Sequence, residues 1–411
     1  AYLSGELSAR GRVVSRLGGT INFAHIWAVS ALSRSGCCVA RQERFVEIQC
    51  PVTMAGEVLR IDLTIDETDV IRGAGEVLKV IRPHWRSDSV RFKLFTDGIT
   101  NKLVGCFNQN NNTVDDTADD ETGDVVLIRV YGNKTDLLID RKKETENIRL
   151  LHRYGYAPTL YATFRNGLAY EFVPGVTLTP DSCREERVWR LVAKRMAQMH
   201  KVRDESVGDC RQPMLPEKID QFLKLVPQVF SDPAKHSRIS QIFPSTDDLR
   251  RDFNELYDRL SQLNSPTVFC HNDLLLGNVI YCADRDQVTF IDYEYAAYNH
   301  QAFDIGNHFT EFAGIDEIDY DRYPSKEFQL RWLRVYLEEF NGHGNCTDSD
   351  VQRLYVQVNQ FALASHFLWA VWALIQAEHS TIDFDFIQFG ETRYREYLRR
   401  REEFLSLTYQ N

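Results

Sequence analysis

The sequence predicts an α+β protein with two lobes, a small β-rich lobe followed by a larger and mainly helical lobe. Three observations favour this class. A chain of 411 residues is long enough for a large core and for two lobes. Short apolar runs typical of strands are concentrated between residues 90 and 175, whereas helical periodicity dominates after residue 187. Apolar residues make up 43% and charged residues 26% of the chain, as in ordinary globular proteins.

Residues 1–58 differ in composition from the rest of the chain. Residues 1–50 contain six Arg, no Lys and only three acidic residues. This bias is typical of a mitochondrial transit peptide. The alternative, which we favour, is a disordered N-terminal extension. We therefore expect the first lobe at residues 59–174 and the second lobe at residues 175–411.

Apolar spacing predicts the first elements of the small lobe in order. Helical spacing predicts a helix at residues 67–81, which ends before Pro83. Strands are predicted at residues 90–95 and 102–107, on either side of a tight turn. Residues 108–124 are polar, acidic and nearly free of apolar side chains, so we expect a disordered, solvated loop there.

An arginine interrupts the next predicted strand, at residues 125–131. Burying a charged group without a partner is costly, so Arg129 either reaches the surface or serves a site. A helix is expected at residues 141–152. Residues 168–175 then predict a strand that enters a Pro-Gly turn.

The second lobe is expected to be mainly helical. Helices are predicted at residues 187–200, 327–340, 351–377 and 388–405. His200 is expected to make a local structural bond, because no second ligand lies at metal-binding spacing. The apolar run 361–375 is only 15 residues long, and a helix needs about 20 to cross a membrane. It predicts a core helix, and we do not expect an integral membrane protein.

Residues 268–311 carry the strongest functional signal in the chain. Strand-like runs at residues 268–270 and 278–282 lie on either side of a polar loop. A third run, at residues 288–293, is expected to form a hairpin with the second. The loop contains Asp273 and Asn278, and the hairpin ends with Asp292. Asp and Asn often make turns. An Asp, an Asn five residues later and an Asp on the next strand, however, follow the order found in protein kinases.

The chemistry of phosphoryl transfer requires these residue types. Carboxylate and amide oxygens are the hard ligands that Mg²⁺ prefers. A carboxylate can also orient and deprotonate an attacking hydroxyl group.

The runs CHNDLLLGN, FIDYEYAAYN and FDIGNHF resemble those of the choline/ethanolamine kinases, and among these the ethanolamine kinases most. The resemblance extends from about Ile61 to about Leu407. It implies a bilobal fold similar to that of protein kinases and aminoglycoside phosphotransferases, with ATP and Mg²⁺ as cofactors. It also implies phosphorylation of the ethanolamine hydroxyl to phosphoethanolamine, the first step of phosphatidylethanolamine synthesis by the CDP-ethanolamine route.

The resemblance implies catalytic roles for three residues and a nucleotide role for a turn. Asp273 is expected to accept the proton of the substrate hydroxyl, while Asn278 and Asp292 hold Mg²⁺. Members of the family carry a motif similar to DGITNKL, so the backbone of Gly98, Thr100 and Asn101 is expected to lie over the ATP phosphates.

The resemblance also implies how the rest of the nucleotide is held. Arg129 stands where protein kinases have a phosphate-binding lysine that pairs with a helix glutamate. Its guanidinium suits bidentate phosphate contacts. We favour Glu144 as its partner, with Glu146 as the alternative. The backbone around Glu171 and Val173 is expected to bind adenine.

The segments HFLWAVW and IDFDF resemble those that line the alcohol-substrate pocket of this family. Trp369 and Trp372 are three residues apart on a helix and therefore project to one face. Phe384 and Phe389 follow. A tryptophan pair at this spacing is usually core, but an ammonium group over such rings gains about 0.5–2 kcal/mol.

The acidic residues near the site help to distinguish ethanolamine from choline as the substrate. The ammonium group of ethanolamine has three N–H donors and that of choline has none. Glu311 is expected to accept from the ammonium group, whereas Asp304 is expected to brace the catalytic loop. Choline kinase is the alternative activity, and a catalytically inactive scaffold is the alternative from another class.

Charge and cysteine content limit the remaining possibilities. The 59 acidic and 48 basic residues give a net charge of −11, which argues against nucleic-acid binding. Nine cysteines without C-x-x-C pairs favour a reducing compartment, so we expect a cytoplasmic enzyme. Cys270 is expected to be a small buried side chain and not a nucleophile. The oligomeric state stays open, with a homodimer as one of the states allowed.

Overall fold

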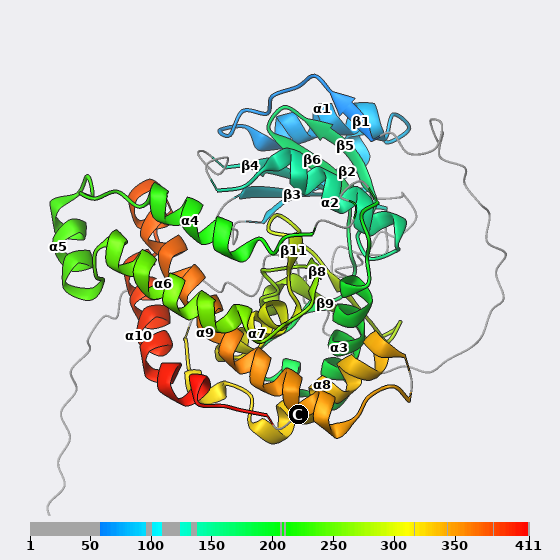
Figure 1. The fold of residues 1–411 in the computed structure, drawn as a ribbon. Helices are drawn as coiled ribbons and strands as arrows, with labels where there is room; N and C mark the ends of the chain where they lie inside the picture. The colour runs from blue at the N-terminus through cyan, green and yellow to red at the C-terminus, as the bar shows by residue number, and fades with distance from the viewer. Residues whose placement is uncertain are drawn as a thin grey trace, which may run out of the picture.

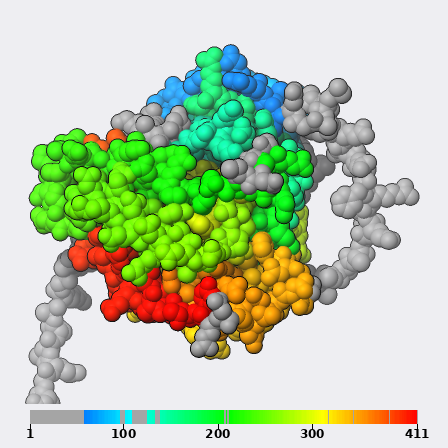
Figure 2. Space-filling view, in the orientation of Figure 1, coloured from blue at the N-terminus to red at the C-terminus, as the bar shows by residue number. Residues whose placement is uncertain are grey.

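The computed structural model describes residues 58–95, 101–108, 124–132, 138–205, 208, 211–315, 317–342, 344–380 and 382–409. The expected extension at residues 1–58 lies outside this part except for Val58, and the expected acidic loop lies outside it except for its two end residues. A β-rich lobe sits on a larger helical lobe (Figure 1). In the space-filling view the first lobe, blue to teal, lies directly against the second, green to red (Figure 2).

The small lobe is built on a six-stranded sheet with the strand order β1-β5-β6-β4-β3-β2. Its strands are β1 (Leu59–Ile61), β2 (Val90–Phe95), β3 (Asn101–Asn108), β4 (Val125–Tyr131), β5 (Leu160–Phe164) and β6 (Gly167–Glu171). β1 pairs with β5 in parallel, and every other neighbouring pair in this sheet is antiparallel. β4 lies between β3 and β6 and is buried over six of its seven residues, which explains its nearly continuous apolar sequence.

Two helices complete the small lobe. α1 (Val70–Ile81) packs on β3 and buries Val70, Ala74, Val77 and Leu78. α2 (Arg141–Arg153) begins at Asp140, whose side chain accepts hydrogen bonds from the backbone of Lys142 and Lys143. This cap fixes where the helix starts, and Arg141 in its first turn reaches Glu294 of the second lobe.

The large lobe is mainly helical. Its helices are α3 (Glu186–His200), α4 (Leu215–Leu225), α5 (Pro233–Ile242), α6 (Thr246–Ser261), α7 (Gln301–Thr310), α8 (Lys326–Asn341), α9 (Asp348–His379) and α10 (Phe386–Leu405). α9 packs against α7, α8 and α10. It is long and apolar enough to cross a membrane, but 94% of its most apolar window is buried within the protein. The predicted core helix is therefore confirmed, although it has 32 residues and is much longer than the apolar run at 361–375.

Short strands and single 3₁₀ turns connect the helices. The strands are β7 (Val176–Thr177), β8 (Thr267–Cys270), β9 (Val279–Cys282), β10 (Gln287–Phe290) and β11 (Ala297–His300). β9 pairs with β10 and β7, and β8 pairs with β11, all antiparallel. The 3₁₀ turns are Ser87–Ser89, Ser182–Arg184, Leu276–Asn278, Glu311–Ala313 and Tyr320–Arg322. β8, β9 and β10 hold the loop and the hairpin that contain the candidate catalytic residues.

The predicted hairpin is confirmed, but two of its strand ends are wrong. Asn278 belongs to a 3₁₀ turn and not to β9. The strand predicted at residues 288–293 ends at Phe290. Asp292 has φ = 64°, a left-handed conformation that cannot continue a strand, so the chain leaves the sheet before it.

Candidate active site

Asp304 holds the loop that follows β8. Its two carboxylate oxygens accept hydrogen bonds from the backbone N–H groups of His271 at 2.8 Å and Asn272 at 2.7 Å. His200 Nε2 lies 2.9 Å from the same carboxylate, and His200 Nδ1 lies 2.7 Å from the hydroxyl of Tyr336. Burial acts to raise the pKa of Asp304, but the hydrogen bonds and the histidines outweigh it and lower that pKa. The predicted brace is confirmed. The bond expected for His200 was a local one, and this is wrong, because its partners Asp304 and Tyr336 lie more than 100 residues away along the chain.

Side chains from the following segment hold the same loop in place. Asn272 has φ = 66° and donates to the backbone oxygen of Tyr295 at 3.0 Å. His308 Nδ1 lies 2.9 Å from the backbone oxygen of Leu274. The side-chain amide of Asn278 donates to the backbone oxygen of Asp273 at 2.9 Å. Asp273 is thus presented by a loop that is braced on both sides.

The predicted catalytic and substrate residues line one cavity of about 100 Å³. The lining includes Asp273, Asn278 and Asp292 together with Glu294, Glu311, Trp369, Trp372, Phe384, Phe389, Tyr295 and Arg393. Burial raises the pKa of Asp273 well above its usual value, and Asp292, Glu311 and Glu294 raise it further. Arg393 acts in the opposite direction. Such a perturbed carboxyl group in a cleft is typical of a functional site.

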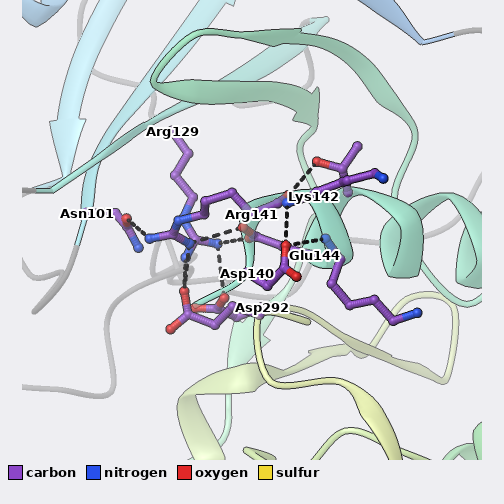
Figure 3. A network of polar contacts seen from close by, with 10 residues as sticks. Asn101, Arg129, Asp140, Arg141, Lys142, Glu144 and Asp292 are labelled. Carbon is purple, nitrogen blue, oxygen red and sulfur yellow. Dashed lines mark hydrogen bonds and ion pairs between the residues drawn. The ribbon is translucent and has the colours of Figure 1, made fainter. Parts of the chain in front are cut away.

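Arg129 joins the two lobes at one edge of this cavity (Figure 3). Its Nη1 lies 3.2 Å from Glu144 and 3.0 Å from Asp292, and its Nη2 lies 2.6 Å from Glu294. The side chain of Arg129 is only 6% exposed. Glu146 is on the surface of α2, where it lies within 4 Å of Lys142 and Lys143. Arg129 therefore pairs with Glu144 and not with Glu146.

Glu294 is a residue to which the sequence assigned no role. It accepts from Arg129, and its Oε2 lies 3.3 Å from Arg141. Burial and the nearby Asp292 raise its pKa to about 7, against the opposing effect of the two arginines. Carboxylate oxygens of Glu144, Asp292 and Glu294 lie within 4.8 Å of one another. Carboxylate oxygens are hard donors of the kind that Mg²⁺ prefers, but in this structure Arg129 lies against all three carboxylates.

Aromatic rings also line the cavity. The rings of Trp369 and Trp372 are 5.7 Å apart and nearly perpendicular. Trp369 Nε1 donates to Asn307 at 2.7 Å, and Trp372 Nε1 donates to the hydroxyl of Tyr295 at 3.0 Å. The ring of Phe389 lies 6.2 Å from Trp372 and 6.0 Å from Phe384. The tryptophan pair thus belongs both to the core and to the cavity wall.

Glu311 lines the cavity, and one of its two carboxylate oxygens is paired with an arginine side chain. Arg393 on α10 donates to Glu311 Oε1, and both side chains are 4% exposed. Arg393 also donates to Thr310 at 3.1 Å. Glu311 Oε2 accepts no hydrogen bond from the described residues. Arg393 was not expected from the sequence, although it is an arginine on the apolar stripe of α10 formed by Phe386, Gly390 and Tyr397.

Of the other predicted nucleotide residues, those that the structure describes do not line this cavity. Asn101 is the first residue of β3 and accepts a hydrogen bond from Arg141 at 3.4 Å. Glu171 ends β6, and its exposed side chain accepts from the backbone and hydroxyl of Thr159. Val173 follows it and is half-buried. Gly98 and Thr100 lie outside the described residues.

The chain matches known proteins over most of its length. Residues 92–398 match the family model of the choline/ethanolamine kinases. Ethanolamine kinase of Drosophila melanogaster is 50% identical over 85% of this chain and 80% of its own length. Human ethanolamine kinase 2 is 47% identical over 84% of this chain and 85% of its own. The solved structure of Plasmodium vivax ethanolamine kinase has a TM-score of 0.69 at 28% identity, covering 81% of this chain and 89% of that one. The extent of these matches shows that this chain belongs to the choline/ethanolamine kinase family.

Proposed function

We propose that the protein transfers the γ-phosphoryl group of ATP to the hydroxyl of ethanolamine. The observation that carries this proposal is one cavity in which the half-buried Asp273, a carboxylate oxygen of Glu311 with no donor among the described residues, and a pair of tryptophans meet. The high identity to ethanolamine kinases over most of the chain supports it. In the reaction the hydroxyl oxygen bonds to the γ-phosphorus, and the bond from that phosphorus to the β–γ bridging oxygen breaks. The products are phosphoethanolamine and ADP.

Asp273 is the group that orients the hydroxyl and accepts its proton. Its loop is fixed by Asp304 and Asn278, so the backbone that carries Asp273 is held in place before the substrate arrives. Its raised pKa gives a carboxylate that binds a proton more readily than an ordinary one. This property suits a group that must take a proton from an alcohol as the phosphoryl group is transferred.

Asn278 and Asp292 are the proposed ligands of Mg²⁺. A bound Mg²⁺ neutralises negative charge on the β- and γ-phosphates. Asp292 lies 3.0 Å from Arg129, which brings a cation of the protein to the same side of the cavity. Arg129 is suited to contact the phosphates, because a guanidinium matches the geometry of phosphate oxygens.

The rest of the nucleotide is proposed to lie between the lobes. Gly98, Thr100 and Asn101 would hold the phosphates, and Glu144 would orient Arg129 toward them. The backbone at Glu171 and Val173 would bind adenine, which does not require the side chain of Glu171 that Thr159 engages.

The size and charge of the cavity fit ethanolamine. A cavity of about 150 Å³ holds one benzene molecule, which has six non-hydrogen atoms. About 100 Å³ is enough room for ethanolamine, which has four such atoms. The free oxygen of Glu311 can accept a hydrogen bond from a primary ammonium group, and the tryptophan rings can lie against its charge.

The test is an assay of ADP release with ethanolamine, choline and an aminoglycoside as alternative acceptors. We expect kcat/KM for ethanolamine to be well above that for choline, and no turnover of the aminoglycoside. Equal or better use of choline would make choline kinase the correct assignment. Absence of turnover with every acceptor would indicate an inactive scaffold.

The cellular role follows from the same proposal. Phosphoethanolamine would enter phosphatidylethanolamine synthesis by the CDP-ethanolamine route. We propose a cytoplasmic location, because the five cysteines of the described residues, Cys270 among them, are free thiols. Burial raises the pKa of Cys270 well above its usual value, as expected for a small side chain of the core.

A further inference from the structure

Arg141 connects three parts of the structure at the nucleotide side of the site (Figure 3). It is the first residue of α2, and its Nη1 lies 3.0 Å from Glu144 Oε2 and 3.3 Å from Glu294 Oε2. Its Nη2 donates to Asn101 Oδ1 at 3.4 Å. The guanidinium lies 4.0 Å from the centre of the Tyr131 ring, and the side chain is 13% exposed. Contacts on this many sides fix the guanidinium in one place.

The carboxylates that Arg141 contacts are the ones that hold Arg129. Glu144 gives Oε1 to Arg129 and Oε2 to Arg141. Glu294 Oε2 accepts from both arginines. A carboxylate is rigid and planar, so fixing one oxygen of Glu144 also fixes the other. Arg141 therefore determines where Glu144 presents its second oxygen to Arg129.

The balance of charge requires a second cation at this position. Arg129 alone faces three carboxylates, Glu144, Asp292 and Glu294, whose oxygens lie within 4.8 Å of one another. Like charges this close oppose one another, and burial increases the cost. Arg141 supplies a second positive charge to two of the three. Glu144 and Glu294 therefore keep a cationic partner when Arg129 turns toward another anion.

We propose that Arg141 is a positioning residue for nucleotide binding, a role that rests on the ATP-dependent activity proposed above. Through Glu144 and Glu294 it sets the orientation in which Arg129 meets the phosphates. Through Asn101 it holds the first residue of β3 against the start of α2. Arg141 itself acts through these neighbours and does not contact the reacting atoms.

The first test is the affinity of Arg141→Met for ATP. This substitution keeps an apolar stem against Tyr131 and removes the charge and the donors. We expect the Kd for ATP, measured by calorimetry in the presence of Mg²⁺ and without ethanolamine, to rise about 10- to 100-fold, the effect of losing hydrogen bonds to charged groups. We expect the KM for ethanolamine to change less than about threefold. Arg141→Lys should recover part of the affinity, because it restores the charge but not the planar set of donors.

A matched control is available on the same helix. Arg149 is exposed and forms no ion pair with another described residue. Arg149→Met removes the same groups from α2 and should leave the Kd for ATP unchanged. A wild-type Kd in Arg141→Met would overturn the proposal. So would equal losses for ATP and ethanolamine together with a lower Tm, because Arg141 would then only support folding.

A double-mutant cycle tests whether Arg141 acts through Glu294. If it does, Arg141→Met weakens ATP binding less in a Glu294→Gln background than in the wild type. Additive effects would overturn this route. Failure of the wild-type protein to bind ATP would be a different result, because it would remove the proposed function before any variant is compared.

Discussion

Arg393 donates to one carboxylate oxygen of Glu311 and leaves the other oxygen without a hydrogen-bond donor among the described residues. Both side chains are buried, so the pair is shielded from solvent. This arrangement changes the expected role of Glu311. Its full negative charge is not available to a substrate, but a single oriented oxygen is. An acceptor that is buried and unpaired is costly, and a substrate that supplies the missing donor removes that cost.

The first prediction concerns Glu311→Gln. The variant keeps the shape of the side chain and an acceptor for Arg393, but it weakens the acceptor for an ammonium group. The KM for ethanolamine should rise about 10- to 100-fold, because a hydrogen bond to a charged group is lost. The KM for choline should change less, because its ammonium has no N–H donor. Steady-state assays with both substrates measure this difference, and equal changes for both would remove Glu311 from the recognition of the ammonium group.

The second prediction concerns Asp273→Asn. The amide has nearly the same size and cannot accept the hydroxyl proton. We expect kcat to fall by about 10²- to 10⁴-fold, the usual contribution of a positioned base. The Kd for ATP should stay close to that of the wild type, because Asp273 is assigned to the alcohol and not to the nucleotide. Rapid turnover by the variant would exclude Asp273 as the base.

The third prediction concerns Asp292→Ala. ATP binding by the wild type should be stronger with Mg²⁺ than without it, and the variant should lose this difference. Calorimetric titrations of both proteins, with and without Mg²⁺, measure it. Asp284→Asn is a suitable control, because Asp284 is exposed in the turn between β9 and β10. If Mg²⁺ still strengthens ATP binding in Asp292→Ala, Asp292 has only a structural role.

Elements with strong periodicity could be predicted from the sequence almost to the residue. Strands β2 and β4 have the predicted bounds, and α2 begins at the predicted residue. The residues that flank these elements favour turns or caps, and a cap at Asp140 fixes the start of α2. No element was predicted between residues 201 and 266, where the structure has α4, α5 and α6. A smaller difference occurs at Asp292, where a left-handed backbone follows the strand and ends it early.

The sequence predicted the site residues that belong to a local motif but missed those that act through long-range ion pairs. Loop residues such as Asp273 and Asn278 carry their chemistry in a local motif. Arg141, in contrast, precedes Glu144 by three residues, and in the sequence the two look like an ordinary exposed ion pair on a helix. Only the folded structure shows that Glu294, 153 residues away, also contacts Arg141. The role of Arg393 was missed for the same reason. The one signal in the sequence is its place on the apolar stripe of α10, where a charged side chain needs a buried partner. Long-range ion pairs of this kind have no periodicity of their own.

The last prediction concerns pH and His308. Burial lowers the pKa of His308 to about 4, because the charged ring would lose its hydration there, and this effect outweighs the hydrogen bond to the backbone oxygen of Leu274, which acts to raise the pKa. In the unfolded chain its pKa is about 6.5. Between pH 6.5 and 4 the unfolded state therefore binds more protons, and the free energy of unfolding falls as the pH falls. Burial also lowers the pKa of other histidines, among them His271, so the contribution of His308 is best isolated by comparison with His308→Gln, which cannot titrate. We expect the variant to be less stable than the wild type at pH 7.5. The difference between their free energies of unfolding should narrow by about 1 kcal/mol at pH 5.5, since only the wild type loses stability through this residue.

Urea denaturation of both proteins at the two pH values measures this difference. A difference that does not change with pH would mean that His308 is not held neutral in the folded protein.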